Sequence, residues 1–160
     1  MNRIFFRAWC KETKQMYYHI DNIGWSLGGA LQGCRSVISE TEEHIMTNNY
    51  DGKENFVLLQ YTGIIDSNKK HIFEGDYCKV TIPDKNGTPI TRIVANVQYD
   101  NTYASFRLGY MSSTNMNIWH NIGFTPDLKI EVIGNIYETD FTKLVKSHNR
   151  DFKIDSLFDE

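Results

Sequence analysis

The sequence predicts a mainly β protein with an N-terminal β-hairpin region, a small bent sheet or SH3-like barrel, and one short C-terminal helix. Three observations predict this class. Nine Tyr and nine Phe residues accompany many Val and Ile residues, all of which are enriched in strands. Short apolar runs recur between clusters of turn residues. One segment near the C-terminus, Thr139–Ser147, has the pattern of a helix.

Turn clusters divide the chain into three parts. We expect residues 1–55 to hold a hairpin and an irregular Gly-rich segment, residues 56–142 to form the β core, and residues 143–160 to form the C-terminal helix and tail. A chain of 160 residues fits one domain with a small appendage. Its hydrophobic content of 41% is enough for a packed core.

Charge and cysteine usage narrow the class of protein. A formal net charge of −3 weighs against a role in coating nucleic acid, because such proteins are usually basic. Cys10, Cys34 and Cys78 are widely spaced and form no CxxC motif, so a disulfide framework and a structural zinc site are not expected. The sequence shows neither a signal-peptide core nor an apolar window of about 20 residues. We expect a soluble cytoplasmic protein with reduced thiols.

The N-terminal part begins with two strand-like runs. Ile4–Trp9 and Met16–Ile20 flank a polar turn and predict a β-hairpin, with Trp9 and Met16 on its packed side. The segment from Trp25 to Asn55 is punctuated by glycines and is expected to be the least regular part. The same segment contains a predicted helical turn over Ser39–Met46.

The stretch Gln60–Asp76 is the densest run of fold-specifying residues. The run Phe56–Thr62 predicts a strand, and Gly63 permits a bend that a Cβ would hinder. Asp66–Lys70 and Glu74–Asp76 predict two turns around a short apolar run. The later strand-like runs, separated by turn residues, are Tyr77–Ile82, Ile90–Tyr99, Tyr103–Tyr110, Trp119–Phe124 and Ile130–Glu138.

Three blocks of this sequence, in order, resemble the YopX family of phage and prophage proteins. They are Phe6–Trp9 with Met16, then Gln60–Asp66 with Ile72–Asp76, and finally Val132–Glu138. The chain departs from the family pattern at Cys10, where the family often has Asp, and at Ile64, where it usually has Leu. It also has Asn68-Lys69-Lys70 where the family's central turn often carries Asn-Gly. The resemblance implies a mainly β protein of the bacterial host cytoplasm that self-associates, and it supplies no reaction.

A polar cluster is the sharpest candidate for chemistry. Asp66, His71, Glu74 and Asp76 lie within a short span, and such side chains bind hard metal ions or act in acid–base catalysis. The alternative is structural, because carboxylates at turns accept backbone N–H groups. We favour the structural interpretation, so we assign no catalytic residue, no metal site and no cofactor. Cysteine catalysis is not expected either, because no partner set accompanies Cys34 or Cys78.

Aromatic side chains supply a second candidate surface. Tyr99 and Tyr103, with Arg92 and Arg107 nearby in sequence, are candidate contacts for nucleic-acid bases and phosphates. The alternative is that the aromatic residues belong to the core, as in most small β folds, and we favour this alternative.

Three functions are therefore ranked. The first is a non-enzymatic phage or prophage accessory protein that binds a phage or host protein, or associates with itself as a homo-oligomer. The second is a nucleic-acid-binding module in phage replication or regulation, which the charge does not favour. The third is a metal-dependent enzyme centred on the polar cluster. No membrane partner is expected.

Overall fold

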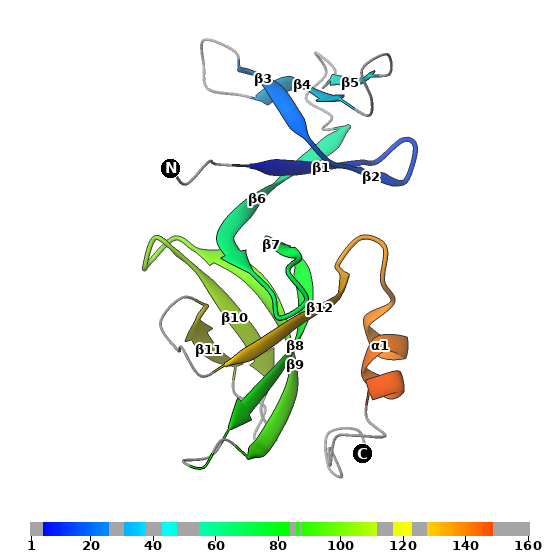
Figure 1. Cartoon of the computed structure of the whole chain (residues 1–160). Coiled ribbons are helices and arrows are strands. Elements are labelled where there is room, and N and C mark those ends of the chain that lie inside the picture. The colour runs from blue at the N-terminus through cyan, green and yellow to red at the C-terminus, as the bar shows by residue number, and fades with distance from the viewer. Residues whose placement is uncertain are drawn as a thin grey trace. The chain divides into compact units, whose positions relative to one another are not determined.

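The structure is a computed structural model that describes residues 5–25, 31–37, 43–47, 55–83, 86, 88–111, 117–122 and 128–148. Over these residues the chain forms twelve strands and one helix (Figure 1). The predicted mainly β class is confirmed. The chain divides into two compact units, Met1–Gly63 and Ile64–Glu160. No helix of the described part is long and apolar enough to cross a membrane.

The first unit begins with the predicted hairpin. Strand β1 (Phe6–Cys10) pairs antiparallel with β2 (Gln15–Tyr17), and Trp9 lies directly opposite Met16. Of these two residues, both predicted to lie on the packed side, Trp9 is buried and Met16 is half-buried. On its other side β1 pairs with β6 (Phe56–Ile65). Strand β1 therefore lies between two neighbouring strands. Four consecutive residues of β1 are buried, so both of its faces are covered, because successive side chains point to opposite faces. The full strand order is β2-β1-β6-β7, where β7 is His71–Phe73.

The segment predicted to be irregular contains two strands of a three-stranded sheet. Strands β3 (Ile20–Trp25), β4 (Leu31–Val37) and β5 (Glu43–Thr47) form it in sequence order. The prediction of an irregular Trp25–Asn55 segment was therefore wrong for β4 and β5. The predicted helical turn was wrong over its last four residues, which belong to β5, whereas residues 39–42 lie outside the described part.

Packing explains why local sequence misled the prediction in this segment. Cys34, on the central strand β4, is only 3% exposed and belongs to a buried cluster with Ala8, Cys10 and Phe56. Burial of one face of β4 stabilises this strand although its one glycine, Gly33, disfavours strand structure locally. Gly24 and Gly33 are in fact paired within this sheet.

The second unit is built on a five-stranded antiparallel sheet of order β11-β10-β9-β8-β12. Its long strands β8 and β9 curve markedly in Figure 1, as the predicted bent sheet requires. The strands are β8 (Asp76–Pro83), β9 (Pro89–Asp100), β10 (Ser105–Met111), β11 (Asn117–Asn121) and β12 (Lys129–Asn135).

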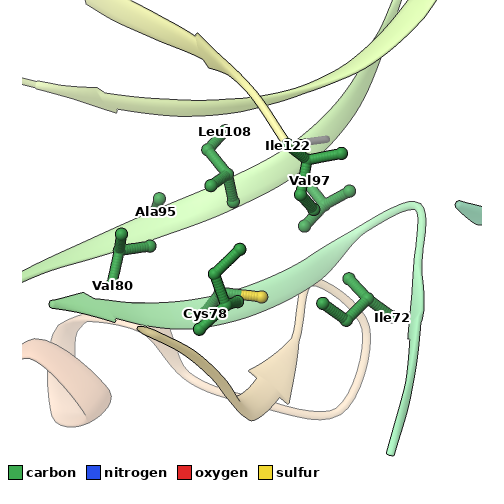
Figure 2. Close-up of a cluster of buried hydrophobic side chains, with 8 residues drawn as sticks. Ile72, Cys78, Val80, Ala95, Val97, Leu108 and Ile122 are labelled. Carbon is green, nitrogen blue, oxygen red and sulfur yellow. The ribbon is translucent and has the colours of Figure 1, made fainter. Parts of the chain in front are cut away.

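One face of this sheet forms the core of the second unit. Figure 2 shows side chains from β8, β9 and β10 converging with Ile72 and Ile122. Ala95 and Val97 are fully buried, whereas Val94 and Asn96 on the other face are partly exposed, which is the predicted alternation along β9. Cys78 is also fully buried in this core.

The predicted C-terminal helix is α1 (Phe141–His148). Asp140 precedes it and accepts a hydrogen bond from the Lys143 N–H through Oδ1 at 3.2 Å, which is an N-cap interaction. Leu144 and Val145 are buried, and the Phe141 ring lies 5.0 Å from that of Tyr77 on β8. The tail, residues 149–160, lies outside the described part.

Candidate functional site

The Asp66 carboxylate is bound by three backbone amides. Its Oδ1 accepts the N–H groups of Asn68 and Lys70, both at 2.8 Å, which closes the turn between β6 and β7. Its Oδ2 accepts the N–H of Val132 on β12 at 2.9 Å. The side chain is 66 positions away from Val132 in sequence and is almost fully buried.

The hydrogen bonds of Asp66 and Ser67 to β12 cover the edge of β12 that faces away from β8. The Ser67 N–H donates to the Ile130 carbonyl at 2.8 Å, next to the Asp66–Val132 bond. Burial raises the pKa of Asp66, but the hydrogen bonds from Val132, Lys70 and Asn68 outweigh it and hold the pKa below its ordinary value. Asp66 is therefore charged at neutral pH and stabilised by backbone donors.

The second turn, before β8, is held in the same way. The Oδ2 atom of Asp76 accepts the Phe73 N–H at 2.8 Å. Gly75 between them has φ of +78°, a conformation that side chains disfavour. Its N–H donates to the Val97 carbonyl, and its carbonyl accepts the Ile136 N–H. The turn thus links Val97 of β9 to Ile136, the residue that follows β12.

The closing motif after β12 is organised by Asn135, which is 7% exposed. Its Oδ1 accepts the N–H groups of Tyr137 and Glu138, both at 3.0 Å, and its Nδ2 donates to Glu138 Oε2 at 2.7 Å. Its backbone N–H donates to Thr139 Oγ1. A Cβ on the adjacent Gly134 would overlap the Thr139 side chain, so this position has room only for glycine.

The polar cluster predicted from sequence is thus divided among different roles. Asp66 and Asp76 accept backbone amides at two turns, whereas His71 is exposed and Glu74 is partly buried. Over the part of the chain that the structure describes, no three His, Cys, Asp or Glu side chains group in a way that could hold a metal ion. The geometry supports the turn interpretation of Asp66 and Asp76.

The predicted aromatic surface lies at the β9–β10 hairpin. Tyr103 is 66% exposed in the connecting turn, and Tyr99 at the end of β9 is 41% exposed. The preferred assignment of these two rings to the core was therefore wrong. The Tyr99 ring packs edge-on against Phe106 at 5.2 Å. The side chain of Arg92 lies outside the description, and its backbone belongs to β9.

Arg107 links the hairpin residues to one another. Its guanidinium carbon lies 4.8 Å from the centre of the Tyr103 ring, which is a cation–π contact. Its Nη1 forms an ion pair with Asp100 Oδ2 at 2.7 Å. This hydrogen bond, assisted by the Thr102 N–H, lowers the pKa of Asp100 below its ordinary value despite the opposing effect of desolvation.

Sequence reasoning missed two residues of this hairpin. Asp100 was assigned only to a turn, although an aspartate seven positions before an arginine across a hairpin is a signal for such a pair. Ala104 has φ of +47°, a left-handed conformation that is costly for a residue with a Cβ. No sequence signal marks this, because glycine or asparagine is the usual residue at such a position.

The comparisons with known proteins agree on one family. The sequence profile described as "YopX protein" matches residues 5–141. The YopX protein of Bacillus subtilis has a similar fold, with a TM-score of 0.57 and 20% identity, over 87% of this chain and 96% of that one. Protein EF1440 of Enterococcus faecalis is similar at a TM-score of 0.54 and 21% identity, over 86% and 96%. No curated protein matches. Because the profile spans most of its length, the chain belongs to the YopX family.

Proposed function

We propose that this protein is a non-catalytic phage or prophage accessory protein that acts by binding another protein, either a phage or host protein or a second copy of itself. The proposal rests mainly on one observation, the exposed but fixed Tyr103 of the β9–β10 hairpin. Tyr and Arg are the residues that most often dominate protein interfaces.

The physical argument is one of preorganisation. An exposed tyrosine normally loses side-chain entropy when a partner immobilises it. Here the Arg107 guanidinium lies against the Tyr103 ring, and the ion pair with Asp100 holds the guanidinium in place. The Tyr103 side chain therefore loses much of its conformational entropy before any partner binds. This makes Tyr103 a suitable anchor for a pocket on another protein.

Nucleic-acid binding is the second candidate, because Tyr103 and Arg107 together resemble a stacking platform. The local charge argues against it. Asp100 accepts a hydrogen bond from Arg107 at 2.7 Å, so the charge available for a phosphate is largely compensated. The net charge of −3 adds no general attraction.

The first experiment compares wild-type protein with Tyr103→Ala in two binding assays. Sedimentation velocity over a range of concentrations measures self-association, and affinity capture from host lysate followed by mass spectrometry measures other partners. We expect Tyr103→Ala to weaken the observed interaction by roughly 30-fold, since an interface anchor contributes about 2 kcal/mol or more. The matched control is Tyr18→Ala, which removes another exposed tyrosine, in the first unit.

Two results would contradict the proposal. One is a monomer with no reproducible partner, and the other is an interaction that Tyr103→Ala and Tyr18→Ala weaken equally. Gel-shift titrations with single- and double-stranded DNA and RNA at two salt concentrations test the second candidate. If nucleic acid binds in a salt-dependent way and Tyr103→Ala abolishes that binding, the function of this hairpin is nucleic-acid binding and not protein binding.

A further inference from the structure

Strand β11 is an edge strand of the five-stranded sheet, with β10 as its neighbour on one side. An edge strand presents backbone N–H and C=O groups that can pair with another chain. Natural sheets protect such edges with short strands, charged side chains, bulges or a covering segment. The edges of this protein therefore differ in how readily they accept a further strand.

The other edge strands among the described residues each carry such a protection. Strands β2 and β7 have only three residues each. Strand β3 pairs with β4 through two register shifts, and β5 begins with the charged Glu43. Strand β12 contains Lys129 and Glu131, and its outer edge is covered by the hydrogen bonds of Asp66 and Ser67.

Strand β11 has none of these protections within its own five residues. The sequence of Asn117–Asn121 is NIWHN, which contains no Asp, Glu, Lys, Arg or Pro. Its pairing with β10 is continuous and shows no register shift. Strand β11 is thus an uncharged, regular edge in a sheet whose opposite edge is covered.

The register with β10 shows which backbone groups of β11 point outward. The Ile122 N–H donates to the Phe106 carbonyl at 3.3 Å, so this pair of residues is hydrogen-bonded. Hydrogen-bonded and non-hydrogen-bonded pairs alternate along an antiparallel ladder. The backbone groups that point away from β10 are therefore those of Asn117, Trp119 and Asn121.

We propose that the outer edge of β11 pairs antiparallel with the same edge of a second copy of this chain, about a two-fold axis at Trp119. Trp119 then lies opposite Trp119 of the second copy, and Asn117 lies opposite Asn121. Each opposed pair exchanges N–H···O=C hydrogen bonds, and no like charges meet. The strand is self-complementary, as a closed two-fold interface requires. This surface is not the Tyr103 turn, so the inference goes beyond the proposed function.

A proline at an outward-facing position tests the hydrogen bonds directly. Sedimentation velocity over a range of concentrations should show a dimer of the wild-type chain. Asn117→Pro removes an outward N–H from each copy and leaves the bonds between β11 and β10 in place. We expect it to raise the dissociation constant of the dimer by roughly 30-fold, because the interface loses two hydrogen bonds. Asn117→Ala keeps the N–H and should dimerise as wild type does.

Cysteine cross-linking tests the position of the two-fold axis. A residue on the axis lies about 5.5 Å from its own copy between Cα atoms, which is within disulfide range. Trp119→Cys should therefore form a disulfide-linked dimer on mild oxidation. In Asn117→Cys the two introduced residues lie about 13 Å apart along the strands and should not cross-link. Non-reducing gel electrophoresis measures both, and circular dichroism checks that each variant is folded.

Three results would overturn the inference. They are a wild-type monomer at every concentration, a dimer that Asn117→Pro does not weaken, and equal cross-linking of the two cysteine variants. If Trp119→Cys fails to fold, the comparison of Asn117→Pro with Asn117→Ala decides. Tyr103→Ala should leave the β11 dimer intact. Self-association that is lost in Tyr103→Ala and kept in Asn117→Pro would support the proposed function and contradict pairing through β11.

Discussion

At the scale of single residues, the Asp66 carboxylate takes the place of a neighbouring strand at the edge of β12. It accepts an outward-facing amide of β12 with one oxygen and closes its own turn with the other. Asn135 and Asp76 act similarly at the two other turns of the family motifs. These polar residues therefore terminate and join strands of the second unit, and their burial reflects that structural role.

We predict that Asp66→Asn destabilises the protein by about 2–4 kcal/mol at neutral pH, because the amide offers one acceptor oxygen and turns a donor toward a buried N–H. Urea unfolding followed by tryptophan fluorescence measures this change. Glu12→Gln, which removes an exposed carboxylate in the β1–β2 turn, is the control and should change stability little. A similar loss in both variants would contradict the role given to Asp66.

The same variant has a defined pH dependence. The pKa of Asp66 is lowered in the folded protein, so the unfolded chain binds its proton more readily. The stabilisation that the ionised Asp66 carboxylate provides is complete above the ordinary aspartate pKa of about 4. It is lost as the pH falls through that value toward the pKa of Asp66 in the folded protein. We expect the difference between wild type and Asp66→Asn to shrink below about pH 4. A difference that grows on acidification would contradict this sign.

Gly134→Ala should destabilise the protein by about 1–3 kcal/mol through steric overlap. The added Cβ meets the Thr139 side chain, which cannot move away easily because its hydroxyl and its N–H both bond to the backbone of Asn135. Thermal unfolding measures the loss. Gly63→Ala is an informative comparison, because nothing lies within 4 Å of its added Cβ and only the φ of +86° opposes the change.

At the scale of elements, the β9–β10 hairpin combines three features. Tyr103 is exposed, Arg107 forms an ion pair with Asp100, and Ala104 has a left-handed backbone conformation. Left-handed conformations of non-glycine residues cost free energy and are found preferentially where function requires a fixed shape. This combination distinguishes the hairpin from the turns at Asp66, Asp76 and Asn135, whose polar side chains accept backbone N–H groups.

Ala104→Gly should stabilise the protein by about 0.5–1 kcal/mol. It relieves a left-handed conformation that costs about 1–2 kcal/mol for alanine and loses roughly half of this gain to the greater freedom of glycine in the unfolded chain. Chemical denaturation measures the free energy of unfolding. If the fixed shape of the turn matters for binding, the same variant should bind its partner more weakly although it is more stable. A destabilised variant would show that the turn is not strained.

At the scale of the whole molecule, the chain has two compact units with separate hydrophobic clusters. The first cluster joins β1 and β6 to β4, and the second lies within the curved five-stranded sheet. Strand β6 runs from the first unit into the second, since its last two residues follow Gly63.

Leu108→Ala tests whether the two cores are energetically separate. Leu108 is 1% exposed in the second core, so truncation should cost about 2–5 kcal/mol. Hydrogen exchange measured by mass spectrometry should show faster exchange in β8, β9 and β10 and little change in β1. The reciprocal variant Phe56→Ala should do the reverse. Equal acceleration in both units after either substitution would show a single cooperative unit.

The strand-rich class, the family and the signature turns are predictable from the order of residues along the chain. Alternating apolar side chains place Ala95 and Val97 on one face of β9 whatever surrounds the strand, because the side-chain period of a strand is two. Gly75 and Asp76 specify a turn through local backbone chemistry. Such features depend on neighbours in the chain, so sequence reasoning identified them.

The residues that meet across long separations in the chain are known from the folded structure and not from local sequence. Tertiary packing made strands of residues 31–37 and 43–47, because burial of Cys34 against β1 and β6 outweighs the local effect of glycine. It turned Asp66 toward Val132, placed Cys10 and Cys34 in one cluster, and exposed Tyr103 beside Arg107. The free energy of these contacts comes from packing and hydrogen bonds between distant segments, which local propensity does not encode.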